Sequence, residues 1–388
     1  MMPLRILVYA QHLSGVGHYV RTYEIARALA SHHQVHWVEG GRPVPHAPCP
    51  RLRLVELPRI RRGPDGLIRG LDASQDTDSL MRLRAARLLE QVEAIRPRVF
   101  LIEYFPFSKW ELSCELLPAI AAVRAQGGRV LCSLRDVVRK TRFETAPDLA
   151  YAQRVTELLN RHFDALLVHA DPALTRLEEH FPAVADIRPP IHYTGLVSEK
   201  LSRAPATDTE IARLTDGRPF VLASAGGGAG GRHLITLAAR TWRDPGVAAG
   251  RPLVICAGLG WSEQFLRELS QGSAPGRVLV LPFSGDFLHW LAAADLSISQ
   301  CGYNTAANLL ETGTPAIVCP NPNMSDQPFR AQRLAERGLV ALLSPDGGVE
   351  DLARAIDHAL SQPRGGHQVD LDGALHTCEW ISEKEVLA

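Results

Sequence analysis

Several features are scarce in this sequence, and each scarcity narrows the class of protein. The seven cysteines of the 388-residue chain are scattered, and none forms a Cys-x-x-Cys pair, which argues against a zinc ribbon or a redox motif. Acidic and basic residues balance at 42 each, so no net field attracts nucleic acid. No apolar stretch reaches the ~20 residues that span a bilayer. We therefore expect a cytoplasmic protein that binds no nucleic acid.

The start of the sequence and its cysteines fit that location. Residues Met1 to Ala10 run straight into a predicted strand, without the apolar segment or cleavage site of a signal peptide. Cys132, Cys256 and Cys319 lie in predicted strands, where cysteine behaves as a small buried hydrophobe. We expect a reducing compartment, and we leave open a peripheral contact with the inner face of a membrane. The oligomeric state stays undetermined.

Short apolar runs alternate with helical patterns, and the alternation occurs twice. This order predicts βαβ units and parallel sheets, hence an α/β protein with two Rossmann-like domains. The stretch Leu196–Pro219 loses the periodicity and is rich in Ser, Ala, Pro, Thr and Asp, so we interpret it as the connection. We predict domains at 1–200 and 201–388, with the last helix free to pack back on the first domain. The strands expected are Arg5–Tyr9, Val35–Val38, Leu52–Leu57, Val99–Glu103, Val130–Ser133, Ala165–His169, Phe220–Ala223, Leu253–Ala257, Val278–Pro282, Leu296–Ser299, Ala316–Cys319 and Val340–Leu343.

The most informative motif begins at Ser299 and continues to Asn308, followed by Gly313-Thr-Pro315 and Asp326-Gln327. A strand ends at Ser299, and a helix is predicted to begin near Gly302 and to end at Gly313. The free N–H groups of a helix start favour an anion, and ligands bind beyond the carboxyl ends of parallel strands. A diphosphate at the helix start and a ribose beside the first turns would fit this spacing.

The stretch Gln300–Gln327 resembles the donor-binding signature of GT-B glycosyltransferases, both the plant secondary-product enzymes and the bacterial MurG-like peptidoglycan N-acetylglucosaminyltransferases. The resemblance implies two Rossmann-like domains that face a cleft, with a nucleotide-sugar donor held by the C-terminal one. It implies that Asp326 and Gln327 bind the sugar hydroxyls. It implies that Cys301, Gly302, Asn304 and Thr305 hold the diphosphate, and it places Tyr303 among the donor-binding residues.

One position departs from the family pattern. The resembled families carry a Glu that accepts both ribose hydroxyls where this sequence has Asn308. An amide makes such bonds without charge assistance, so the contacts should be weaker. A deoxyribose donor such as a dTDP-sugar would need less at this position, although UDP remains the first choice. Glu311 follows three positions later, but we do not assign it the role.

Two further loops follow predicted strands and are rich in glycine. In Ser224–Gly231 the consecutive glycines Gly226, Gly227 and Gly228 let several backbone N–H groups point at one anion. A flexible linker is the alternative. Near the N-terminus, Gly15-Val-Gly17-His18 opens a predicted helix and resembles the acceptor loop of MurG-like transferases and of related sugar-nucleotide hydrolases. Phe283 follows another strand, where the resembled families bind the base through backbone groups, although it could equally be a core aromatic.

His18 is the candidate general base. A histidine at a helix start has a lowered pKa, and neutral imidazole can take the proton of an acceptor hydroxyl. Glu103 and Asp136 both follow predicted strands, and either could orient His18 or pair with a nearby arginine. The strings Asp76-Thr-Asp78 and Asp370-Leu-Asp372 lie in polar stretches, so we expect solvated turns and no metal site.

The leading hypothesis is an inverting, metal-independent glycosyltransferase that moves a sugar from a nucleotide-diphosphate sugar to an acceptor hydroxyl. The nucleotide sugar would be a substrate, and no resident cofactor is expected. A sugar-nucleotide hydrolase or epimerase of the same fold is the first alternative, and a non-catalytic sugar-nucleotide sensor is the second. Neither the acceptor nor the sugar follows from the sequence, because acceptor loops carry no short motif.

Overall fold

The computed structural model describes residues 3–13, 15, 17–44, 49–63, 65–72, 75–138, 146–202, 205–226, 231–258, 261–281, 284–362 and 365–386. It divides into two units, residues Met1–Val197 with Asp370–Ala388, and residues Ser198–Val369. The predicted boundary after residue 200 lies three residues from the first division. Residues 370–388 belong to the first unit, so the second unit ends at Val369 and not at residue 388.

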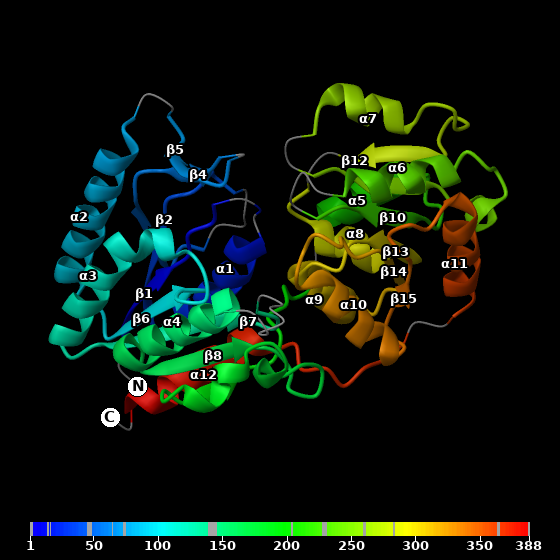
Figure 1. Cartoon of the computed structure of the whole chain (residues 1–388). Helices are drawn as coiled ribbons and strands as arrows, with labels where there is room; N and C mark the ends of the chain where they lie inside the picture. Colours follow the sequence, from blue (N-terminus) through cyan, green and yellow to red (C-terminus); the bar gives the residue numbers. More distant parts are fainter. Residues whose placement is uncertain are drawn as a thin grey trace. The chain divides into compact units, whose positions relative to one another are not determined.

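Unit 1 is built on a seven-stranded parallel sheet in the order β3-β2-β1-β6-β7-β8-β9. Helices α2 and α3 lie side by side against it (Figure 1). The C-terminal helix α12 packs on α1. A short antiparallel hairpin, β4 with β5, is separate from the main sheet. The elements are β1 (Arg5–Tyr9), α1 (Gly17–Ala30), β2 (Gln34–Glu39), β3 (Leu52–Glu56), β4 (Ile60–Arg62), β5 (Ile68–Gly70), α2 (Thr77–Ile95), β6 (Val99–Glu103), α3 (Ser113–Ala125), β7 (Arg129–Arg135), α4 (Ala146–His162), β8 (Ala165–His169), β9 (Ile191–Tyr193) and α12 (Gly373–Val386).

Unit 2 contains a six-stranded parallel sheet in the order β12-β11-β10-β13-β14-β15, with helices between the strands (Figure 1). The stretch predicted as an unstructured connection contains the 11-residue helix α5 (Pro205–Thr215), because Ile211 supplies a buried side chain that the polar composition concealed. The other elements are β10 (Val221–Ser224), α6 (Arg232–Thr241), β11 (Leu253–Cys256), α7 (Glu263–Leu269), β12 (Val278–Leu281), α8 (Phe287–Ala293), β13 (Leu296–Ser299), α9 (Tyr303–Thr312), β14 (Ala316–Val318), α10 (Gln327–Glu336), β15 (Ala341–Leu342) and α11 (Val349–Ser361).

The α/β class with two Rossmann-like units is confirmed, and burial explains why the strands were legible. Strands of a parallel sheet that is covered on both faces read as continuous apolar runs. Every residue of β6, β8, β10 and β13 is buried. The strands that the sequence did not predict, β4, β5 and β9, have three residues each, too few for a recognisable pattern.

In each sheet the sequence order of the strands reverses once, and the position of this reversal determines where the site residues lie. In unit 1 the strand order reverses between β1 and β6, and in unit 2 it reverses between β10 and β13. Ligands of open α/β sheets bind beyond the carboxyl ends of the strands at such a reversal. A site is therefore expected at the loops after β1 and β6 in unit 1, and at those after β10 and β13 in unit 2.

Candidate functional site

His18 and Glu103 meet at the strand reversal of unit 1. His18 is the second residue of α1, which follows β1, and Glu103 is the last residue of the neighbouring strand β6. The His18 Nδ1–H donates to Glu103 Oε1 over 2.5 Å. The His18 side chain is 29% exposed, whereas the Glu103 side chain is fully buried. The structure thus brings together two of the three residues that the sequence nominated for catalysis.

Two buried cations, Arg21 and Lys109, form ion pairs with the Glu103 carboxylate. Arg21 Nη2, one turn after His18 on α1, donates to Oε1 over 2.6 Å, and Lys109 Nζ donates to Oε2. All three side chains are buried. Burial by itself would raise the pKa of Glu103, but its hydrogen bond from His18 and the charges of Lys109 and Arg21 hold the pKa well below its usual value of 4.5. Glu103 is therefore an anion at neutral pH.

The ionised Glu103 determines the tautomer of His18. A carboxylate can only accept, so Nδ1 of His18 carries the proton and Nε2 carries the lone pair. Burial lowers the pKa of His18 from 6.5 to about 4, and it outweighs the opposing effect of Glu103. His18 is consequently neutral between pH 5 and 8, with Nε2 available as a proton acceptor.

The segment after Glu103 has an unusual backbone that positions this cluster. Tyr104 and Lys109 both adopt left-handed conformations, with φ of +65° and +63°. Such strain in residues other than glycine concentrates at functional sites. The centroid of the Tyr104 ring lies 5.2 Å from that of the His18 ring and 5.1 Å from the guanidinium carbon of Arg135. Tyr104 therefore packs against one side of the imidazole.

Asp136, Gly15 and Gly17 are the other residues of unit 1 that the sequence nominated. Asp136 is buried just after β7, and its Oδ1 accepts the N–H of Val137 over 2.7 Å. Gly17 is the first residue of α1, and Gly15 is exposed with no atom within 4 Å of an added Cβ. Glu103, rather than Asp136, is thus the carboxylate hydrogen-bonded to His18.

A second buried histidine lies along the same edge of the sheet. His169, the last residue of β8, is hydrogen-bonded to Ser133 through Nε2 at 2.7 Å and to Thr194 through Nδ1 at 2.8 Å. The Thr194 hydroxyl donates to the carbonyl of Gly195, so it accepts from Nδ1–H. Burial, aided by the charge of Arg21, lowers the pKa of His169 from 6.5 to about 3. His169 is a neutral structural residue.

These two histidines predict that unit 1 loses stability in mild acid. Unfolded histidine takes up a proton below pH 6.5, whereas folded His18 and His169 do so only near pH 4 and pH 3. These two side chains should lower stability by roughly 2.7 kcal/mol per pH unit between about pH 6 and 5, and other buried histidines of unit 1, such as His12, add to this slope. Native-state hydrogen exchange of the β8 amides measures the slope for unit 1 alone. The His169→Gln variant should lose about 1.4 kcal/mol per pH unit of it, and an unchanged slope would contradict the assignment.

In unit 2 the two loops of the strand reversal are adjacent. Ser224 at the end of β10 pairs with Ser299 at the end of β13, and both are buried. Gly226 and Gly231 have φ of +72° and +92°, so glycine is favoured at both ends of this loop. A Cβ on Gly231 would lie 2.8 Å from Ala225 Cβ and 3.2 Å from the side chain of Gln300. Gly231 thus lies close to Gln300, the residue that follows β13. The predicted donor residues Gly227, Gly228 and Phe283 lie outside the described residues.

Helix α9 begins and ends where the sequence predicts. Gly302 is its N-cap, and Gly313, with φ of +61°, is its C-cap. The helix has ten residues, and its N-cap residue, Gly302, has no side chain that could cap it. The N-terminus of a helix favours an anion. Cys301 and Tyr303 are buried, whereas Asn304 and Thr305 are partly exposed beside this end.

Asp326 is held by an arginine that the sequence did not single out. Arg330 Nη2 donates to Asp326 Oδ2 over 2.8 Å, and both side chains are buried. The other end of the guanidinium, Nη1, donates to the carbonyl of Cys301 over 2.7 Å. Gln327 is also buried, and its Oε1 accepts the N–H of Asn321 over 2.9 Å. Arg330 therefore joins the turn before α9 to the start of α10 (Gln327–Glu336), the two parts of the predicted donor grip.

Asn308 is buried on α9 and lies against a carboxylate from a distant part of the sequence. Its Nδ2 donates to Glu199 Oε2 over 3.4 Å. Glu199 is the second residue of unit 2, 109 positions earlier. No local pattern predicts this contact, because Glu199 lies in an aperiodic polar stretch. Lys109 was equally hidden, whereas the spacing of Asp326 and Arg330, four apart on one helix, could have revealed that pair.

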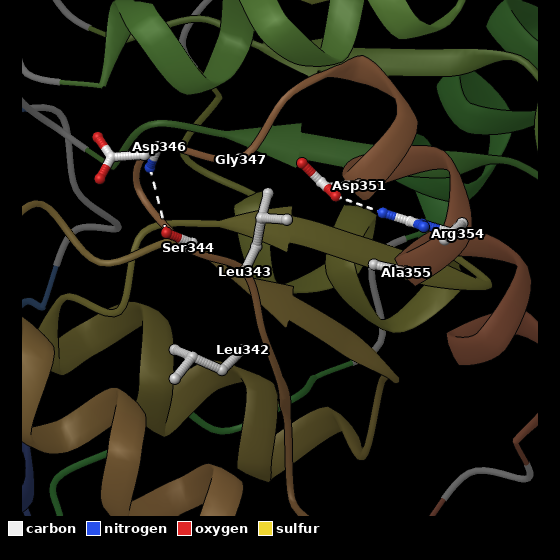
Figure 2. A pocket seen from close by; sticks show the side chains of 8 residues that line it. All are labelled: Leu342, Leu343, Ser344, Asp346, Gly347, Asp351, Arg354 and Ala355. Atoms are coloured by element: carbon white, nitrogen blue, oxygen red, sulfur yellow. Dashed lines mark hydrogen bonds and ion pairs between the residues drawn. The ribbon is translucent and has the colours of Figure 1, made fainter.

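A separate pocket lies near the edge strand β15 and contains none of the predicted donor residues. It is formed by the end of β15, the following turn and α11, and Figure 2 shows that Asp351 and Arg354 point toward each other. These two side chains form an ion pair of 2.5 Å, and Ser344 Oγ accepts the N–H of Asp346. Strand β14 separates β15 from β13, so this pocket is not the site at the strand reversal.

Metal-type clusters and membrane-spanning helices are both absent from the described part of the chain. No group of three or more His, Cys, Asp or Glu side chains there could hold a metal ion. The Asp76-Thr-Asp78 string caps α2, since Asp76 Oδ2 accepts the N–H of Ser79 over 2.8 Å. Among the same residues, no helix combines the length and hydropathy needed to cross a membrane.

Comparison with solved structures defines the class of fold. TcCGT1 in complex with UDP covers 99% of this chain and 95% of its own at a TM-score of 0.64 and 13% identity. Spinosyn forosaminyltransferase SpnP covers 99% of both chains at a TM-score of 0.62 and 15% identity. Together with the two strand reversals, this similarity identifies the GT-B fold of two Rossmann-like domains.

Sequence comparison narrows the class within that fold. Residues 227–367, most of unit 2, match the glycosyltransferase family 28 C-terminal domain. The UDP-N-acetylglucosamine–N-acetylmuramyl-(pentapeptide) pyrophosphoryl-undecaprenol N-acetylglucosamine transferase of Desulforudis audaxviator is 34% identical over 178 residues, 42% of this chain and 45% of that protein. The chain therefore matches less than half of that relative's length. These findings support a GT-B glycosyltransferase of the MurG and UDP-glycosyltransferase type.

Proposed function

We propose that this protein transfers a sugar from a nucleotide-diphosphate sugar, with UDP favoured, to an acceptor hydroxyl. Unit 2 supplies the donor site and unit 1 supplies the base. The observation that carries the proposal is the pair of His18 and Glu103 at the strand reversal of unit 1, in a chain whose second unit matches a glycosyltransferase C-terminal domain.

The reaction proposed is a single displacement. The acceptor oxygen attacks the anomeric carbon and gives its proton to Nε2 of His18, while the bond from that carbon to the phosphate oxygen breaks. The departing nucleoside diphosphate keeps the electron pair. Attack opposite the leaving group inverts the configuration at the anomeric carbon. Glu103 stabilises the imidazolium that forms, and it keeps Nδ1 protonated before the proton moves.

The donor end of the reaction rests on charge rather than on a metal. Negative charge builds on the leaving diphosphate, and the N-terminus of α9, which follows β13, would stabilise it through the helix dipole. The glycine loop after β10 lies beside this end through Gly231 and Gln300. On this basis we propose that no metal is required. Asp326 and Gln327, which Arg330 and Asn321 fix in place, would bind the sugar hydroxyls.

The acceptor is proposed only as a class. The Desulforudis relative is named for a pyrophosphoryl-undecaprenol acceptor, and one structural neighbour is named for spinosyn. A lipid-linked or a small-molecule hydroxyl would both suit a base that is partly exposed. We further propose a cytoplasmic protein, at most peripheral to a membrane, because all seven cysteines are unpaired, as in a reducing compartment.

A donor screen by thermal shift tests the proposal directly. UDP-, dTDP- and GDP-sugars are each added at about a hundred times a Kd in the micromolar range. At that concentration the correct donor should raise the free energy of unfolding by about 2.7 kcal/mol. We expect UDP-sugars to give the largest rise in Tm. The proposal fails if no sugar nucleotide raises the Tm. Release of free nucleotide with no acceptor present would instead favour the hydrolase, and binding without turnover under any condition would favour the sensor.

A further inference from the structure

The first residues of unit 2 run alongside α9 and bring a carboxylate to its middle. Glu199 Oε2 accepts the Nδ2–H of Asn308 over 3.4 Å. The next residue, Lys200, forms an ion pair of 3.0 Å with Glu311 of the same helix. Residues 198–200 are thus attached to α9 at successive points. Glu199 is partly buried, and Asn308 is 5% exposed.

A ribose bound at this helix would need a carboxylate at about this place. With the diphosphate at the N-terminus near Gly302, Asn308 lies about 9 Å further along the helix, at ~1.5 Å per residue. The two hydroxyls of a ribose are donors, and a carboxylate accepts both with charge assistance. Asn308 cannot do this, because its amide has a single acceptor oxygen.

We propose that Glu199 supplies the ribose-binding carboxylate that α9 itself lacks, and that Asn308 orients it through its amide. The inference rests on the proposed function, since it concerns the nucleotide of the same donor. Helix α9 carries a carboxylate of its own nearby, Glu311, but Glu311 forms an ion pair of 3.0 Å with Lys200. The donor is consequently a ribonucleotide, and a 2′-deoxyribose donor should bind less well.

The test compares UDP with 2′-deoxy-UDP by isothermal titration calorimetry. The wild-type chain should prefer UDP by roughly tenfold or more, the value of one charge-assisted hydrogen bond. The Glu199→Gln variant should lose most of that preference, because one amide oxygen replaces the two oxygens of the carboxylate. Its Kd for UDP should rise by about tenfold or more, and its Kd for 2′-deoxy-UDP, which keeps only the 3′-hydroxyl, should rise by less. Measurable binding of the deoxynucleotide also reports that the site is folded.

Two matched variants separate this role from a general effect of charge. Glu311→Gln removes the neighbouring carboxylate and should leave both dissociation constants unchanged. The double variant Glu199→Gln with Asn308→Glu moves the carboxylate onto α9 and should restore the preference for UDP. A Glu199→Gln variant that keeps the wild-type preference overturns the inference but leaves the proposed function standing. A wild-type chain that binds neither nucleotide overturns both.

Discussion

Replacing His18 by alanine should lower kcat for sugar transfer by about 10²–10⁴-fold, the usual contribution of a general base. The Kd for the donor nucleotide should stay unchanged, because the donor is assigned to unit 2 and His18 lies in unit 1. Initial rates with a UDP-sugar and calorimetry with UDP measure the two quantities. A transfer rate within twofold of the wild type would remove His18 from the mechanism.

The control and the pH profile distinguish a base from a structural residue. His32 is exposed just after the same helix, and His32→Ala should transfer sugar at the wild-type rate. The lowered pKa of His18, about 4, keeps its Nε2 unprotonated at neutral pH. We therefore expect kcat/KM to be flat from about pH 5 to 8 and to fall as the pH drops through 4. A fall centred near pH 6.5 would show that burial does not lower the pKa of His18 as described.

Replacing Glu103 by glutamine should have the second large effect, and on stability as well as on rate. Arg21 and Lys109 would remain buried without their anion, which costs about 3–5 kcal/mol in the free energy of unfolding. Transfer should also slow, because a neutral amide no longer stabilises the His18 imidazolium. Native-state hydrogen exchange of the β6 amides measures the loss in unit 1, and kcat is measured on the folded fraction.

The matched control lies in the same stretch of chain. Glu111 pairs with Arg62 at 2.8 Å, but its side chain is 47% exposed, so Glu111→Gln should change stability by no more than about 1 kcal/mol. The low pKa of Glu103 gives stability that is present above its unfolded value of 4.5 and is lost as the pH falls through its folded value. Below pH 4.5 the wild-type and glutamine chains should therefore converge. If Glu103→Gln and Glu111→Gln are equally stable at pH 7, the ion cluster around Glu103 does not stabilise unit 1.

Several parts of this protein follow from the sequence by itself. The parallel strands were predictable because burial on both faces leaves continuous apolar runs such as β6 and β8. The limits of α9 followed from Gly302 and Gly313. Glycine is tolerated at the start of a helix and is favoured at its end. The α/β class and the donor class therefore needed no coordinates, because local periodicity and one contiguous motif carry them.

The tertiary structure decided what depends on contacts between distant residues. The sequence nominated both Glu103 and Asp136, and only the order of the strands, β1 beside β6, makes Glu103 the partner of His18. The tertiary structure likewise places Lys109 in contact with the Glu103 carboxylate and packs α12 on unit 1. Strand order and loop approach are set by packing over long sequence separations, which leave no local pattern. The motif at Ser299–Gln327 thus indicated a donor site, while the carboxylate proposed to complete it, Glu199, was visible only in the fold.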